Sequence, residues 1–130
     1  MHPRFSIEVD QSRDMVRIVL TGMFLLEDVA DFLEARRKSY AKLTCAPGRL
    51  VALTDLRELK IMPQDTVDAW AAHLTSPKNR LRRMAFVVAP TLVLGQLKRA
   101  LAGRDKRDAR TFTDPAEAEA WLLDEDGAAQ

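Results

Sequence analysis

Two short apolar stretches decide the fold: Leu50-Val51-Ala52-Leu53 and Met84-Ala85-Phe86-Val87-Val88-Ala89. Both are continuous runs, and neither shows the alternation of apolar and polar residues that marks a strand with one wet face. Continuous runs of this length are typical of strands that are buried on both faces of a helix-covered parallel sheet. We therefore expect the two stretches to lie side by side, in the same direction, in the middle of a sheet.

An antiparallel hairpin is expected upstream of these runs. Phe5, Ile7 and Val9 alternate with polar residues, which is typical of a half-exposed edge strand. After a polar turn at residues 11–14, the alternation resumes from Met15 to Met23. Two alternating segments joined by a short turn predict a hairpin.

Four amphipathic segments are expected to be helices, because their apolar residues recur at intervals of three or four. The clearest start is Asp114-Pro115, since Asp is a favoured N-cap and Pro a favoured first-turn residue. A short strand, Arg110 to Thr113, precedes that helix. The other three segments follow Gly22 as far as about Leu43, cover about Gln64 to Leu74, and begin at Pro90-Thr91.

The order of these elements predicts an α/β fold. It is a single domain with a mixed, mostly parallel five-stranded sheet, an N-terminal antiparallel hairpin and four helices. The domain is expected to cover residues 1–124, with residues 125–130 as a flexible acidic tail.

Composition excludes several classes of protein. Of the 130 residues, 47% are hydrophobic, which excludes a disordered chain, and the net charge of +1 argues against a dedicated nucleic-acid binder. Cys45 is the only cysteine, so neither an intramolecular disulfide nor a cysteine-based zinc cluster can form. The longest nearly apolar stretch, residues 84–95, is shorter than the roughly 20 residues of a membrane span, and residues 1–5 do not resemble a secretory signal. A cytoplasmic protein is expected.

The element order and two segments resemble the SpoIIAA-like branch of the STAS domains. The segments are Asp55-Leu56-Arg57, after the first apolar run, and Arg110 to Leu122, which reads RTFTDPAEAEAWL. This branch is also similar in architecture to the lipid-exchanging CRAL-TRIO domains. The resemblance implies a non-enzymatic interaction or regulatory module.

Regulatory members of that family carry a phosphorylated Ser at the start of the second helix, in a stretch of the type Asp-Ser-Ser-Gly. The matching region here, Met62 to Thr66, has neither Ser nor Gly. Asp65 is expected to be the N-cap of the helix, with a permanent mimic of phosphate as the alternative. Thr66 remains a possible site of modification.

No catalytic residues are assigned. Asp55 is expected to cap the following loop or to pair with Arg57, and a nucleophilic role is the alternative. Cys45 would need a base to lower its pKa, and His73, the only internal histidine, is expected to be a partly exposed helix residue. Two histidines cannot form a His-rich metal site, and no glycine-rich phosphate loop is present. No metal and no cofactor are therefore expected.

The third helix combines an apolar stripe with basic residues. Leu94, Leu97 and Leu101 share one side, next to Lys98 and Arg99. The stripe is expected to pack on the sheet, and a weak contact with an anionic membrane surface is the alternative.

The leading hypothesis is a binding module whose partner is an unknown protein, with possible formation of homodimers. A carrier of a small apolar or lipid ligand is the first alternative, and a small enzyme that uses Asp55 or Cys45 is the second. The expected contact surface lies at the strand ends and comprises Asp55, Arg57, Met62, Gln64, Asp65, Thr66 and Pro90.

Overall fold

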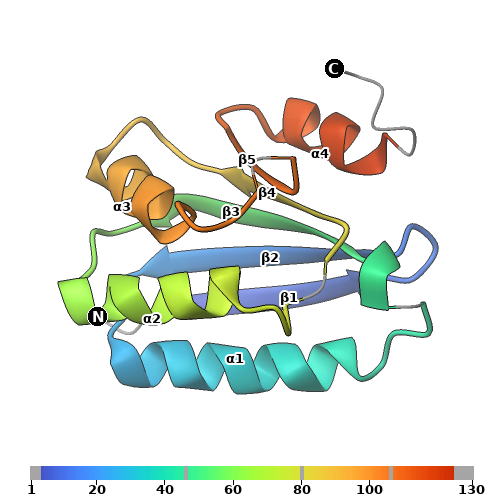
Figure 1. The fold of residues 1–130 in the computed structure, drawn as a ribbon, viewed down its shortest axis with the longest axis horizontal. Coiled ribbons are helices and arrows are strands. Elements are labelled where there is room, and N and C mark those ends of the chain that lie inside the picture. The colour runs from blue at the N-terminus through green and yellow to red at the C-terminus, as the bar shows by residue number, and fades with distance from the viewer. Residues whose placement is uncertain (1–3, 46, 80, 106, 125–130) are drawn as a thin grey trace.

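One mixed sheet forms the centre of the protein in the computed structural model, which describes residues 4–45, 47–79, 81–105 and 107–124. Its five strands lie in the order of the sequence (Figure 1). The expected acidic tail, residues 125–130, lies outside the described residues. The strands are β1 (Arg4–Asp10), β2 (Met15–Gly22), β3 (Val51–Leu59), β4 (Arg83–Val87) and β5 (Ala109–Phe112).

The pairing of the strands confirms the prediction from the two apolar runs. β3 and β4 pair in parallel, from Val51 opposite Arg83 to Asp55 opposite Val87. β2 pairs in parallel with β3, β5 pairs in parallel with β4, and β1 pairs antiparallel with β2 as the edge of the expected hairpin. β3 and β4 are therefore inner strands of the sheet.

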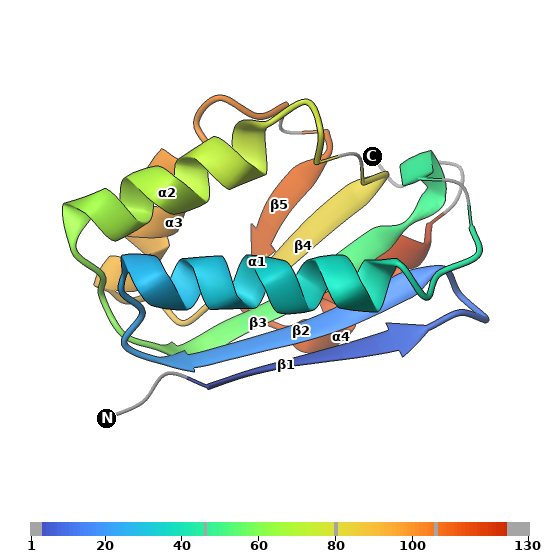
Figure 2. The same ribbon diagram turned by 90° about the horizontal axis from the view of Figure 1, so that it is seen from below.

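Helices cover both faces of the sheet. α1 and α2 lie in front of it and α4 lies behind it (Figure 2). The apolar residues of α3 pack in the same core as those of α1 and α2, so three helices share one face. The helices are α1 (Leu26–Tyr40), α2 (Gln64–Thr75), α3 (Leu92–Ala100) and α4 (Pro115–Leu123), and a short 3₁₀ helix, η1, covers Pro47–Arg49.

Alternate residues of each inner strand enter different cores, because successive side chains of a strand point to opposite faces. Leu56 of β3 and Phe86 of β4 belong to the larger core beneath α1, α2 and α3. Val51 and Leu53 of β3 belong to a smaller core with Ala118 and Leu122 of α4. As far as Leu56, the even-numbered residues of β3 therefore face the larger core, and the odd-numbered residues face the side of the sheet that α4 covers.

β3 is longer than its apolar run predicted. It continues through Asp55 and Arg57 to Leu59, so these two residues lie inside the strand and not beyond its end. The register with β2 shifts after Val19 opposite Asp55, and both Leu56 and Leu59 are buried in the larger core. The extra length escaped the sequence pattern because a bulge breaks the alternation.

The expected N-cap of α2 was wrong. Pro63 occupies the cap position and no side chain caps the helix. The backbone N–H groups of Thr66 and Val67 donate to the carbonyl of Pro63. Asp65 lies in the first turn, where its carboxylate accepts a hydrogen bond from the Thr66 hydroxyl at 3.3 Å. A negative charge in the first turn still stabilises the helix through the helix dipole.

Candidate functional site

A cavity of about 70 Å³ lies between the sheet and helices α1, α2 and α3. Its wall is mostly apolar and comes from the inner strands β2, β3 and β4 and from these three helices. Trp70 of α2 lines it and packs against two phenylalanine rings, with 5.4 Å between the ring centres of Trp70 and Phe32. The apolar residues of the wall are Ile18, Leu20, Phe32, Ala52, Leu56, Leu59, Met62, Val67, Trp70, Leu74, Leu81, Met84, Phe86, Val93, Leu97 and Ala100.

Four polar residues of the wall form one connected group, which we call the polar cluster: Arg36, Tyr40, His73 and Asn79. The guanidinium of Arg36 donates to Oδ1 of Asn79 at 2.8 Å and lies over the Tyr40 ring, 4.1 Å from its centre. Nδ2 of Asn79 donates to the backbone carbonyl of His73 at 3.3 Å. Arg36 and Tyr40 come together because residues four apart lie on the same side of a helix.

The polar cluster is cationic. No Asp or Glu lines the cavity. Burial, together with the positive charges of Arg36 and Arg104, lowers the pKa of His73 to about 4. Burial also raises the pKa of the Tyr40 hydroxyl. At neutral pH the cluster therefore contains a charged guanidinium, a neutral imidazole and a neutral phenol.

The Tyr40 hydroxyl is buried and makes no hydrogen bond within the described part of the chain. Arg36, whose guanidinium lies over the Tyr40 ring, cannot accept a hydrogen bond from this hydroxyl, because a guanidinium only donates. A buried polar group without a partner costs about 1–3 kcal/mol. The hydroxyl is therefore a donor that lacks an acceptor.

A glutamine holds the connection between β3 and α2. The side chain of Gln96, on α3, donates to the carbonyl of Met62 at 2.7 Å and accepts from its N–H at 2.9 Å. This pair of bonds fixes the Met62 backbone, and the Met62 side chain packs against the larger core. Of the residues expected at a contact surface, Met62 is the one that lines the cavity.

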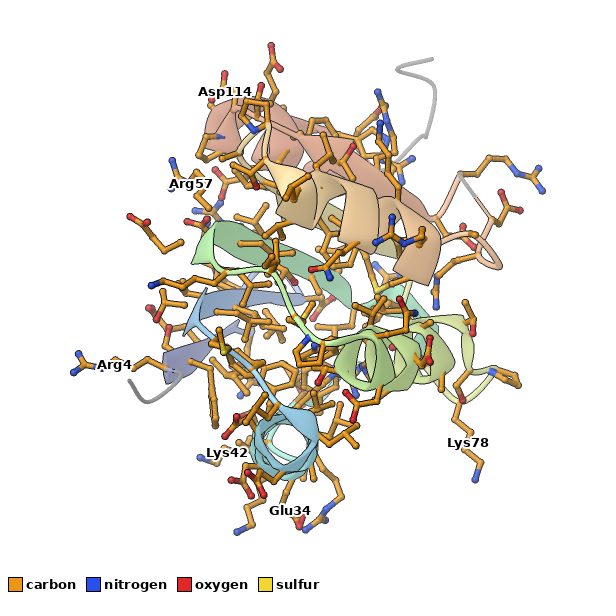
Figure 3. The ribbon with its side chains drawn as sticks, turned by 90° about the vertical axis from the view of Figure 1, so that its left-hand side faces the viewer. Arg4, Glu34, Lys42, Arg57, Lys78 and Asp114 are labelled. Carbon is orange, nitrogen blue, oxygen red and sulfur yellow. The ribbon has the colours of Figure 1, made fainter. Side chains whose placement is uncertain are left out.

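Asp55 and Arg57 form an ion pair on the other face of the sheet. Nη2 of Arg57 lies 2.8 Å from Oδ2 of Asp55, and Nε lies 3.0 Å from Oδ1. These bonds lower the pKa of the Asp55 carboxyl. Figure 3 shows Arg57 directed outward, on the side of the sheet away from α2. The pairing that the sequence predicted is confirmed, and it lies apart from the cavity.

The other expected surface residues do not join this pair. Thr66 has no exposed surface, so in this fold its hydroxyl is inaccessible to a modifying enzyme. Gln64 is exposed and donates to Asp68 at 2.8 Å, and Pro90 is exposed before α3. The expected contact surface is thus divided between the two faces of the sheet and the start of two helices. Arg36 and Tyr40 were not among the residues that the sequence predicted at a site. Their spacing of four residues on an amphipathic helix is the signal that could have indicated them.

Cys45 lacks the surroundings of an activated thiol. Burial and the negative charge of Asp14 raise its pKa, which favours the unreactive protonated form. His73 belongs to the polar cluster, while the charged groups that act on Cys45 are Asp14 and Arg49. No group of three or more His, Cys, Asp or Glu that could hold a metal occurs among the described residues.

The apolar stripe of α3 packs on the core as expected: Val93 and Leu97 are buried, and Leu94 and Leu101 are partly buried against them. Leu92, at the start of the helix, is 74% exposed. Other large apolar side chains are exposed after β2 and after β3, in the connections and at the start of α1. They lie near the same, carboxyl ends of the parallel strands. We call this set the apolar rim: Met23, Leu25, Leu26, Ile61 and Leu92.

Comparison with solved structures finds a protein from Shewanella loihica PV-4, described as an uncharacterized protein of the DUF3478 family with a SpoIIAA-like fold. The two chains superpose with a TM-score of 0.67 at 20% sequence identity, over 94% of this chain and 96% of the other. The chain has a SpoIIAA-like fold. No protein-family model and no curated protein matches the sequence. Within the described part of this SpoIIAA-like structure, no helix is long and apolar enough to cross a membrane.

His73 makes stability depend on pH in a defined window. The unfolded state binds more protons than the folded state between pH 6.5, the ordinary pKa of histidine, and about 4, its pKa in the fold. We expect the free energy of unfolding to fall as the pH decreases through this window, and to fall less in His73→Gln. Urea unfolding at several pH values measures both slopes. Equal slopes for the two proteins would show that His73 is not buried as described.

Proposed function

We propose that this domain is a non-enzymatic module that binds a small, mainly apolar ligand in the cavity. The observation that carries the proposal is the cavity itself, which is lined by side chains of α1, α2, α3 and the sheet. Protein interiors are otherwise close-packed, with few voids larger than a water molecule. A space of this kind in the larger core, with one polar end, is suited to a ligand that has an apolar body and a polar group.

The volume limits the size of the ligand. A dry apolar cavity of about 150 Å³ holds benzene, which has six carbon atoms. The cavity here, about 70 Å³, is half as large and therefore suits an apolar body of about three to five carbon atoms. The similarity in architecture to lipid-exchange domains supports binding of an apolar compound, and the volume favours a short one.

The candidate nucleophiles support a role without catalysis. Arg57 holds the Asp55 carboxylate through two hydrogen bonds and lowers its pKa, which makes it a weak base. The raised pKa of Cys45 leaves its thiol protonated at neutral pH. Neither residue lines the cavity. A ligand in the cavity would therefore be bound away from both groups.

A titration followed by NMR tests ligand binding. The probes are straight-chain acids and alcohols whose apolar chains have about three to five carbon atoms. We expect saturable shifts of the Trp70 indole N–H signal, because Trp70 lines the cavity, and little change at Trp121, which packs outside it against Phe112. The two indoles thus provide a signal and a control in one spectrum.

A variant that fills the cavity sharpens this test. Ala100 lines the cavity, so Ala100→Leu should abolish the Trp70 shifts without loss of stability, since filling a void offsets the larger side chain. Ala120→Leu, at an exposed position of α4, should bind as the unmodified protein does. Absence of any saturable Trp70 shift with every probe, or full binding by Ala100→Leu, would contradict the proposal.

The apolar rim favours a second candidate function, in which the domain binds a protein. Its five exposed apolar residues lie near the carboxyl ends of the parallel strands, and exposed apolar groups of this kind often mark protein contacts. A second copy of the chain is the partner that can be tested directly.

Sedimentation equilibrium tests self-association through the rim. We expect the average mass to rise with concentration above the monomer value of 14.6 kDa, and to stay at that value in Leu92→Arg. Ala72→Arg, at an exposed position of α2 outside the rim, is the matched control and should associate normally. A constant monomer mass for the unmodified protein at all concentrations would dismiss the homodimer.

A further inference from the structure

We propose that the cavity selects a ligand with a carboxylate group, which is bound by the Arg36 guanidinium and the Tyr40 hydroxyl while the apolar chain of the ligand lies against Trp70 and its neighbours. This inference rests on the proposed function and adds the chemical class of the ligand. Three features of the polar cluster carry it: its charge, its unpaired donor and its position at a wall that is otherwise mostly apolar.

The first feature is a positive charge without a counter-charge. Arg36 is partly buried, and no carboxylate lies within ion-pair distance of it in the described ranges. Its guanidinium donates to the neutral amide of Asn79. Taking a charge out of water is unfavourable unless an opposite charge or several hydrogen bonds compensate. A carboxylate in the cavity would supply the opposite charge.

A second guanidinium strengthens the positive field. Arg104 donates to the carbonyls of Leu74 and Asn79 at 2.7 and 3.3 Å, so its charge is held beside His73 and the polar cluster. Its Nε has no hydrogen-bond partner among the residues that the structure describes. The same two arginines that disfavour protonation of His73 would attract an anion to this end of the cavity.

The second feature is the count of donors and acceptors. Tyr40 offers a buried O–H with no acceptor, and Arg36 has N–H groups beyond the one that binds Asn79. The Oδ1 of Asn79 already accepts from Arg36. The cluster thus needs an acceptor, and a carboxylate is a group that accepts at both oxygens and donates at neither. An ammonium group would add donors and repel the arginines.

The third feature is the apolar wall that begins beside the cluster. Phe32 lies one turn before Arg36 on α1, and Trp70 lies one turn before His73 on α2, and both line the cavity. A short chain attached to the bound carboxylate would therefore leave water and meet apolar side chains. Short-chain carboxylic acids combine the two properties that this site offers.

The test compares ligands that differ only in the head group. Pentanoate, 1-pentanol and pentylamine are titrated by NMR, with the Trp70 indole as reporter, against the unmodified protein, Arg36→Met, Tyr40→Phe and Arg37→Met. Arg37 is the matched control, since it lies next to Arg36 but is exposed and pairs with Glu34. We expect pentanoate to bind the unmodified protein about tenfold or more tighter than pentanol, as expected for a hydrogen bond to a charged group.

The variants separate the two contacts. Arg36→Met should lower the affinity for pentanoate about tenfold or more, because the carboxylate is bound through the charge of Arg36. The affinity for pentanol, which carries no charge, should change by less than about twofold. Tyr40→Phe should lower the affinity for pentanoate about threefold to tenfold, because one hydrogen bond to the carboxylate is lost. Its thermal midpoint should equal or exceed that of the unmodified protein, since it loses an unpaired hydroxyl. Arg37→Met should match the unmodified protein with every ligand.

The outcomes distinguish this inference from the function on which it rests. If no probe shifts the Trp70 signal, ligand binding in the cavity itself fails. If pentanol binds as tightly as pentanoate, or Arg36→Met and Tyr40→Phe retain full affinity for pentanoate, the cavity binds ligands and selection of a carboxylate is wrong. If Arg36→Met does not fold, the comparison of head groups on the unmodified protein and the Tyr40→Phe result decide.

Discussion

The absence of a wet face on β4 and on the first half of β3 is the constraint on which the rest of the structure depends. Side chains of both parities must be buried, so Ala52 and Leu56 enter the core beneath three helices while Val51 and Leu53 enter the core beneath α4. A slip of one residue in the β3–β4 register would exchange these sets. Three helices on one face line a cavity, whereas α4 alone covers the other face of these strands.

This division explains why the ion pair and the polar cluster do not meet. Asp55 and Arg57 lie on the α4 face, where they are partly exposed and satisfy each other. Arg36 and Tyr40 lie on the opposite side, where burial leaves a charge and a hydroxyl without matching groups. Unmatched polar groups in a core reduce stability, and they are retained most readily where they contact a ligand. The polar cluster is for that reason the stronger candidate site.

The sequence predicted the order of the elements and the direction of the strands because burial on two faces leaves a continuous apolar run. It did not predict the full length of β3, because a bulge places Leu56 and Leu59 in the same core. The cavity was also beyond prediction, because it depends on how side chains from α1, α2 and α3 fill the space above the sheet. His73 and Asn79 join Arg36 only in the folded chain, from a segment about 40 residues away.

The most direct test of the apolar space is a crystal structure of the protein under xenon pressure, since xenon enters apolar cavities. We predict a xenon atom between β3 and helices α1, α2 and α3, in contact with Leu56, Val67 and Leu97 of the cavity wall. A crystal in which these side chains pack directly against one another, with no xenon between them, would contradict the cavity and the binding site built on it.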